Sequence, residues 1–221
     1  MNYAEIAEAS HAQHLEIFGA FHLMGDATDP VGAKTLVLLG PKEPGFWAHF
    51  QSCPEYQDNA ADPMDRWSSR VISSLAHALN ATAVFPFGGP PFQPFIAWAM
   101  KSGRAWQSPA GPLVHDSAGM MVSYRGALAF AQEIALPELP TCPCDSCTTK
   151  PCLTACPVSA LYATTGYDLN RCHQHLESTA GEPCMTQGCA ARRACPVSHA
   201  YARRSEQSAF HMKSFHPGAN G

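Results

Sequence analysis

Apolar and polar positions alternate along the first 140 residues with the spacings of helices and strands. Tyr3 to Leu15 has the spacing of a short amphipathic helix, and Asp62 to about Ala81 that of a longer one. In the longer segment, Asp62 and Pro63 suit the N-cap and the first helical position. We also expect helices at 46–53 and 94–101, and strands at 16–23, 35–40, 82–85 and 120–130.

This alternation predicts a three-layer α/β domain over residues 1–140. The strand at 35–40 is apolar on both faces, as in a covered sheet. Pro137 and Pro140 bracket a linker, and we expect a second, α+β domain at 141–221.

Composition and charge narrow the classes of function. Apolar residues make up 46% of the 221 residues, which indicates a globular chain. The net charge of −4 argues against nucleic acid or an anionic membrane as the main partner. No apolar run is long enough to span a bilayer, and the N-terminus shows no secretory signal pattern, so we expect a cytoplasmic protein.

The cysteines are the most informative residues. Cys53 stands alone, and the other nine fall between Cys142 and Cys195. Eight of them form two arrays of four, each ending in Cys-Pro-Val-Ser. The first array has intervals of two, four and three residues, and the second has intervals of eleven, four and five; the members are Cys144, Cys147, Cys152 and Cys156, then Cys172, Cys184, Cys189 and Cys195.

These arrays resemble bacterial ferredoxin modules with two 4Fe-4S clusters. A cubane cluster needs four thiolates that converge from different directions, and in those modules each Cys-Pro cysteine binds the cluster of the other array. On that resemblance, one cluster takes Cys144, Cys147, Cys152 and Cys195, and the other takes Cys156, Cys172, Cys184 and Cys189. One departure is the interval between Cys147 and Cys152, which has four residues where the modules have two.

Disulfide formation and zinc binding are the two other roles that the cysteines could have. A disulfide framework requires an oxidising compartment, which the N-terminus does not suggest. Two structural zinc sites are the stronger rival, but such sites usually pair two C-x2-C knuckles and only Cys144/Cys147 has that spacing. Cys142 is a spare thiol that could replace Cys144.

The residues around the cysteines have open roles. Basic side chains either compensate the charge of the clusters, dock an electron partner, or form an ordinary solvated face; they are Lys150, Arg171, Arg192, Arg193, Arg203 and Arg204. We expect His173, His175 and His199 either to contact the ligand cysteines or to lie on the surface, and not to be ligands themselves.

A second resemblance concerns residues 80–200. The stretch from Trp98 to Trp106, the segment from Gly111 to Met120 and the following Tyr124-Arg125-Gly126 are similar to the corrinoid-binding core of epoxyqueuosine reductases and of CblC-type cobalamin-processing proteins. Ala105 replaces a glycine of that pattern and Asp116 a proline. The matching positions are Gly103, Trp106, His115, Gly119, Arg125 and Gly126.

This resemblance implies a nitroreductase-like domain that binds a cobalamin-type corrinoid at those six residues, with the clusters supplying electrons for cobalamin reduction or processing. Residues 87–92 lack the carboxylate that epoxyqueuosine reductases use as proton donor, so their tRNA-modifying reaction is not expected. For Arg125 the alternatives are an anionic ligand group or an internal ion pair; for His115, a corrin contact or a satisfied turn histidine.

Two other functions remain open, and no catalytic residue is assigned. The chain could be a ferredoxin-like carrier that docks to a larger oxidoreductase, or a reductase that uses FMN in place of the corrinoid. In each case we expect an electron-donor protein or reductase as partner. The sequence has no dinucleotide fingerprint and no P-loop.

Overall fold

The computed structural model describes residues 1–27, 29–162 and 166–217 of a mixed α and β chain. The chain forms two compact units. Unit 1 comprises Met1–Ala105 and Ser123–Pro140, and unit 2 comprises Trp106–Val122 and Thr141–Gly221. No helix in the described part of the chain combines the length and the apolar character needed to cross a bilayer.

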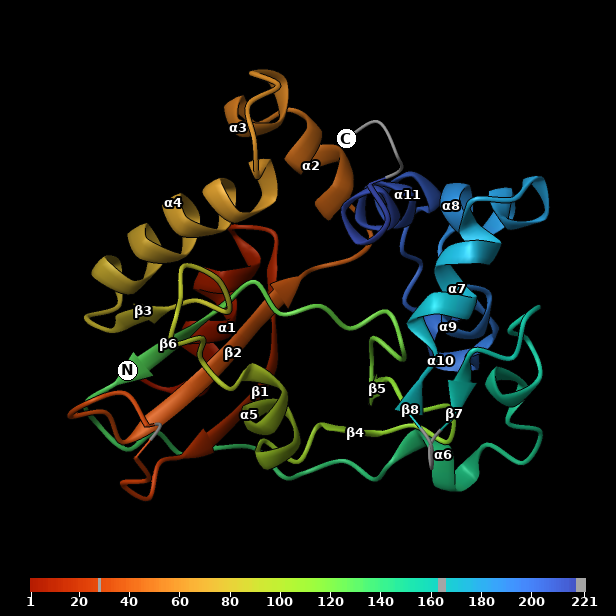
Figure 1. Cartoon of the computed structure of the whole chain (residues 1–221). Helices are drawn as coiled ribbons and strands as arrows, with labels where there is room; N and C mark the ends of the chain where they lie inside the picture. Colours follow the sequence, from red (N-terminus) through yellow and green to blue (C-terminus); the bar gives the residue numbers. More distant parts are fainter. Residues whose placement is uncertain (28, 163–165, 218–221) are drawn as a thin grey trace. The chain divides into compact units, whose positions relative to one another are not determined.

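Unit 1 is built on a four-stranded antiparallel sheet (Figure 1). Its strands are β1 (Leu15–His22), β2 (Thr35–Pro41), β3 (Thr82–Val84) and β6 (Gly126–Phe130), in the order β1-β2-β6-β3. All seven residues of β2 are buried, as the apolar pattern on both faces predicts. A register shift between Ile17 and Gly19 marks a bulge in β1.

Five helices belong to unit 1. They are α1 (Tyr3–His11), α2 (Phe46–Gln51), α3 (Pro54–Gln57), α4 (Pro63–Ala78) and α5 (Phe95–Lys101). α4 packs on β3 and β6, while α1 and α5 pack on β1. Four of these five helices begin within one residue of the predicted positions, and α3 was not predicted. α1, α2 and α4 end earlier than predicted.

The ends of two helices follow from local chemistry. Asn2 and Glu5 form a capping box at the start of α1. α4 starts with Pro63 at its first position, but Asp62 is in the left-handed region with a φ of 51° and its side chain makes no capping bond. Asp62 therefore occupies the predicted N-cap position, but its side chain does not accept a hydrogen bond from the first turn of the helix.

The core of unit 1 is aromatic where α2 meets α4. Phe46, Phe50 and Trp67 are fully buried, and the ring centroids of Phe46 and Trp67 are 5.1 Å apart in an edge-on arrangement. Val71 and Leu75 continue the buried stripe of α4 as its spacing predicts.

The strand predicted at 120–130 is only half as long, because β6 begins at Gly126. The carbonyl oxygens of Met120, Met121 and Val122 accept hydrogen bonds from the arginine side chains Arg192 and Arg203. These carbonyls are thereby satisfied outside any β-ladder, and Met120–Val122 belongs to unit 2.

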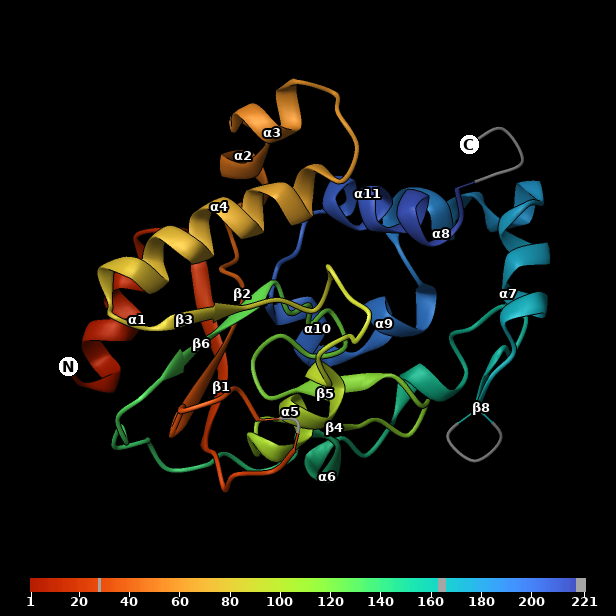
Figure 2. The same ribbon diagram turned by 60° about the vertical axis from the view of Figure 1, so that its left-hand side comes forward.

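Unit 2 consists mostly of short helices (Figure 2). Its segment at 106–122 contains most of β4 (Ala105–Gln107), whose first residue is counted in unit 1. β4 pairs with β5 (Leu113–His115) in the same segment. Further on are two short paired strands, β7 (Leu161–Tyr162) and β8 (Gly166–Tyr167). The helices are α6 (Pro143–Ser146), α7 (Leu169–Leu176), α8 (Glu182–Gln187), α9 (Ala190–Ala194), α10 (Pro196–Ala200) and α11 (Ser205–Phe215), with 3-10 turns η1 (Pro151–Leu153) and η2 (Thr179–Gly181).

The units differ from the expected domains in one respect. Residues 106–122, which we expect within a domain at 1–140, belong to unit 2 because Ala110, Val114 and Met120 are buried against Cys152 and Cys195. A single apolar stretch thus contributes to the packing of cysteines more than thirty residues away along the chain.

Thr35 offers a test of the polar contacts inside unit 1. Its buried hydroxyl donates to the carbonyl of Gln132 (3.0 Å) and accepts from the amide of Ile134 (3.0 Å). Thr35→Val keeps the shape but leaves both backbone groups without a partner, so we expect it to destabilise unit 1 by about 1–3 kcal/mol. Unfolding followed by tryptophan fluorescence measures this, since Trp47, Trp67 and Trp98 lie in unit 1.

Thr82→Val is the matched control, because Thr82 is an exposed strand residue of the same unit. We expect it to change stability by less than about 0.5 kcal/mol. Equal stability of the two variants would contradict the role given to the Thr35 hydroxyl.

Candidate functional site

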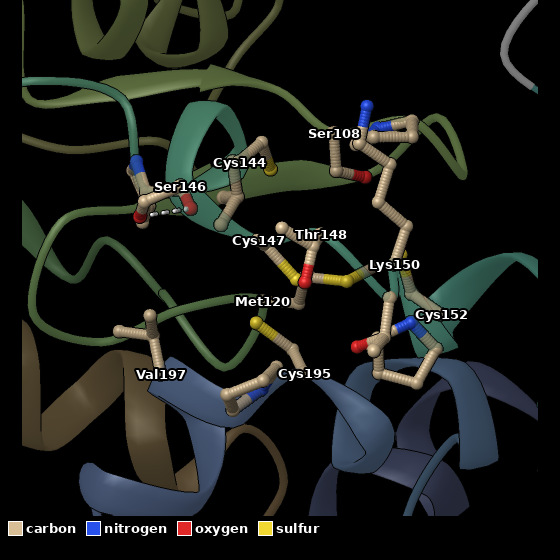
Figure 3. Close-up of a pocket in the computed structure, with 16 residues that line it drawn as sticks. Ser108, Met120, Cys144, Ser146, Cys147, Thr148, Lys150, Cys152, Cys195 and Val197 are labelled. Atoms are coloured by element: carbon tan, nitrogen blue, oxygen red, sulfur yellow. Dashed lines mark hydrogen bonds between the residues drawn. The ribbon is translucent and has the colours of Figure 1, made fainter.

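Four cysteines from both arrays surround one cavity inside unit 2 (Figure 3). The cavity has a volume of about 300 Å³ and is lined by Cys144, Cys147, Cys152 and Cys195. In the close-up, these residues approach the cavity from different sides. This volume is roughly ten times the share of one water molecule in the liquid, so it is larger than a single ion requires.

Prolines explain how such short segments turn around the cavity. Pro143, Pro151 and Pro196 each stand at the start of a short helix or 3-10 turn. Cys195 ends α9 and precedes α10 in an extended conformation (φ −66°, ψ 124°), which is favoured before proline. The Cys-Pro pair therefore breaks the path between the two helices and leaves Cys195 at the corner.

The segment at 106–122 forms another wall of the same cavity. Ser108, Val114 and Met120 line it, and Trp106 packs against the same buried cluster of side chains. The amide of Met120 donates to the hydroxyl of Ser198 (2.9 Å), which holds this segment against α10.

Gly119 is required for that contact. Its φ is +55°, and a Cβ atom added there would lie 2.3 Å from the amide nitrogen of Ser198. Arg192 and Arg203 add side-chain donors to the carbonyls of Met120 and Met121. The role of Gly119 in the structure is thus close backbone packing inside unit 2.

The surroundings of Cys144 and Cys152 favour the neutral thiol at both residues. Burial raises the pKa of Cys144 to about 12, with further contributions from Cys142, Cys152 and Cys195. Burial also raises the pKa of Cys152, and Cys195 adds to the effect. Thiolates this close together repel one another, so a cationic group between them would stabilise the ionised forms.

The other four cysteines also lie near one another. Burial raises the pKa of Cys172, a hydrogen bond from Tyr167 lowers it, and charge interactions with Cys189, Cys156 and Cys184 raise it again. The Tyr167 hydroxyl donates to the sulfur of Cys172 at 3.0 Å.

The four cysteines of this second group come from four places in the chain. Cys172 is on α7, Cys184 is buried on α8, and Cys189 precedes α9. Cys156 follows η1, and its sulfur accepts a hydrogen bond from the amide of Ala160 (3.2 Å).

The two groups contain the same cysteines as the two predicted ligand sets. Cys195 lies with the first array and Cys156 with the second, so the Cys-Pro cysteines exchange places. Cys142 precedes α6 and does not line the cavity, whereas Cys144 does. All ten cysteines are free thiols.

Within residues 1–27, 29–162 and 166–217, no three or more His, Cys, Asp or Glu side chains are grouped so as to hold a metal ion. A tetrahedral zinc site with sulfurs about 2.3 Å from the metal would need the four sulfur atoms within about 4 Å of one another.

The six residues of the corrinoid resemblance are divided between the units. Gly103, Arg125 and Gly126 belong to unit 1, and Trp106, His115 and Gly119 to unit 2. None of the six lines the cavity at Cys144, Cys147, Cys152 and Cys195.

Arg125 and His115 both have internal partners. The guanidinium of Arg125 pairs with Asp65 (3.3 Å) and donates to the carbonyl of Tyr124 (3.0 Å). His115 is fully buried, and its Nδ1 atom accepts from the amides of Ser117 (3.2 Å) and Ala118 (3.3 Å). For Arg125 these contacts agree with an internal ion pair rather than an anionic ligand. For His115 they agree with a satisfied turn histidine rather than a corrin contact.

The basic residues of unit 2 have different environments. Lys150 lines the cavity. Arg193 donates to the carbonyl of Gly188 (3.0 Å), and Arg171 reaches the hydroxyl of Tyr162 (3.4 Å). Arg204 is the residue before α11. Lys150 is thus placed to compensate charge in the cavity.

The histidines lie outside the cavity lining. The Nδ1 atoms of His173 and His216 are 2.6 Å apart, and His199 is exposed. His175 is partly buried on α7.

The contact between Met120 and Ser198 can be tested directly. Ser198→Ala leaves the buried Met120 amide without its acceptor, so we expect faster hydrogen exchange in the peptide that covers 106–122. Ser214→Ala is the control, because Ser214 is exposed on α11. Unchanged exchange in the Ser198 variant would show that other contacts hold the segment.

Comparison with known proteins adds no relative. No protein-family model matches the chain, no curated protein matches its sequence, and no solved structure matches it. The functional argument therefore depends on the geometry of the two cysteine groups.

Proposed function

We propose that the chain is an iron-sulfur electron-transfer protein that holds two 4Fe-4S clusters in unit 2. The observation that carries the proposal is the convergence of Cys144, Cys147, Cys152 and Cys195, from segments up to fifty-one positions apart, on a cavity of about 300 Å³. Four thiols at the walls of a cavity of this size match the ligand requirement of a cubane cluster.

The chemistry of the donor set fits such a cluster. Sulfur ligands select soft metals and iron-sulfur clusters over hard cations. The raised pKa of Cys144 and of Cys152 has its origin in burial and mutual repulsion, which bound iron would offset. When bound, a 4Fe-4S cluster accepts and donates one electron at a time.

The chain links the two groups of cysteines through short segments. α9 separates Cys189 from Cys195, which spans about 9 Å at 1.5 Å per residue. Cys152 and Cys156 are separated by three residues. Each of these short connections thus joins a cysteine of one group to a cysteine of the other, which favours electron exchange between the sites.

Protein groups around the cysteines set the electrostatic environment. Lys150 provides a positive charge at the cavity, and the Tyr167 hydroxyl and the Ala160 amide donate to sulfurs of the second group. Hydrogen bonds to cluster sulfurs and nearby charge are established determinants of reduction potential. We propose that an electron-donor protein or reductase supplies the electrons.

We expect anaerobically purified protein to contain about eight iron atoms and about eight acid-labile sulfides per chain, with absorbance near 400 nm. Removal of iron by a chelator under reducing conditions should abolish the absorbance and destabilise unit 2, since metal binding and folding are coupled. Stoichiometric zinc without sulfide would replace this proposal with two structural zinc sites.

The choice between Cys142 and Cys144 gives a sharper test. We expect Cys144→Ser to lose about half of the iron, because it removes a ligand that lines the cavity. Cys142→Ser is the matched control two residues away and should keep the full iron content. The reverse outcome would assign the cluster to Cys142.

The second part of the proposal is the acceptor of the electrons. From the resemblance to corrinoid proteins, we propose that the chain passes electrons to a cobalamin-type corrinoid, in a nitroreductase-like unit 1 coupled to a ferredoxin-like unit 2. The α/β composition of unit 1 supports this assignment, whereas the internal contacts of Arg125 and His115 do not contribute to it.

Hydroxocobalamin tests the acceptor separately from the clusters. We expect a shift of the corrinoid absorbance bands on titration and retained cobalt after desalting. A yellow protein that releases FMN on heating would favour the flavin alternative. Neither corrinoid nor flavin, with intact clusters and a co-purifying oxidoreductase, would identify a plain electron carrier.

A further inference from the structure

We propose that the hydroxyl of Ser108 donates a hydrogen bond to a sulfur atom of the cluster held in the cavity, and so raises the reduction potential of that cluster. The inference deepens the proposed function and depends on it. Ser108 lies outside both cysteine arrays, in the segment at 106–122.

Ser108 is buried without a hydrogen-bond partner for its side chain. Its exposed fraction is 2%, and its Oγ atom has no partner among the described residues. Burial of a hydroxyl without a hydrogen bond costs free energy, so buried hydroxyls in proteins generally have a partner. The missing partner is explained if a bound group occupies the adjacent cavity.

A turn holds the backbone of Ser108. The amide of Ser108 donates to the carbonyl of Pro112 (3.0 Å), and its carbonyl accepts from the amide of Gly111 (2.9 Å). Both backbone groups are therefore occupied, and the hydroxyl is the remaining polar group. Figure 3 shows this hydroxyl at the cavity, opposite the cysteine side chains.

The other hydroxyls around the cavity differ from Ser108. Ser146 is exposed, and its hydroxyl donates to the carbonyl of Pro143 (3.3 Å). Thr148 and Thr149 are exposed as well. Of the four hydroxyl residues that line the cavity, only Ser108 is buried.

The expected effect on the potential follows from charge. A cluster bound by four thiolates becomes more negative on reduction, so its sulfur atoms accept hydrogen bonds more strongly in the reduced state. A donated hydrogen bond therefore stabilises the reduced form, and loss of the donor lowers the midpoint potential.

The test compares three variants of the full chain by redox titration monitored by electron paramagnetic resonance. We expect Ser108→Ala to lower the midpoint potential of one cluster by about 28 to 59 mV, which corresponds to a threefold to tenfold change in the reduction equilibrium at 59 mV per tenfold. The other cluster should be unaffected. Ser108→Thr keeps a hydroxyl and should restore most of the potential, and Ser146→Ala should leave both clusters unchanged.

The outcomes separate this inference from the proposed function. Full iron and sulfide content with an unchanged potential in Ser108→Ala would overturn the inference alone. Wild-type protein without iron and sulfide would overturn both. Loss of the cavity cluster in Ser108→Ala with retention in Ser108→Thr would support the contact, whereas loss in both variants would reject the hydroxyl as the determining group.

Discussion

The structure of unit 2 depends on the placement of Cys195 beside cysteines that precede it by more than forty residues. At the end of the segment at 106–122, the amide of Met120 and the carbonyls of Met120 and Met121 bond to the same C-terminal region, through Ser198, Arg192 and Arg203. The cavity therefore has walls from three separate stretches of the chain. None of these stretches could enclose it alone, because each is short and interrupted by proline.

Burial and the charge of neighbouring thiolates both raise the pKa of Cys144 and Cys152. The apolar contacts of Val114 and Met120 remove the cysteines from water, which favours neutral thiols. Sulfur donors select soft metals and iron-sulfur clusters over hard cations, and a positive charge between the cysteines would stabilise their ionised forms. The hydroxyl of Ser108, which has no hydrogen-bond partner among the described residues, lies at the same cavity. The proposed cluster would therefore offset the rise in pKa that burial and thiolate repulsion cause at Cys144 and Cys152.

Several residues that match the corrinoid-protein pattern have packing roles in the structure. Gly119 matches a glycine of the family pattern, yet in the structure its missing side chain allows close contact with Ser198. Arg125 has Asp65 as partner across a buried contact, and burial lowers the pKa of this arginine. The same residue types can therefore be explained by packing within each unit, and solution binding is the measurement that separates the two explanations.

Periodicity predicted β2, which is buried throughout, and the buried stripe of Trp67, Val71 and Leu75 on α4. It missed α3 and made the strand of β6 about twice its length. The two sets of cysteines were implied by the resemblance to ferredoxin modules with two clusters, and their role as ligands stays a prediction. In the structure Cys195 lines the same cavity as Cys144, Cys147 and Cys152. Tertiary structure alone decided that β6 starts at Gly126, that 106–122 packs with the cysteines, and that Ser108 faces their cavity. These features depend on hydrogen bonds and contacts between residues distant in the chain, such as Met120 with Ser198, which no local pattern of side chains encodes.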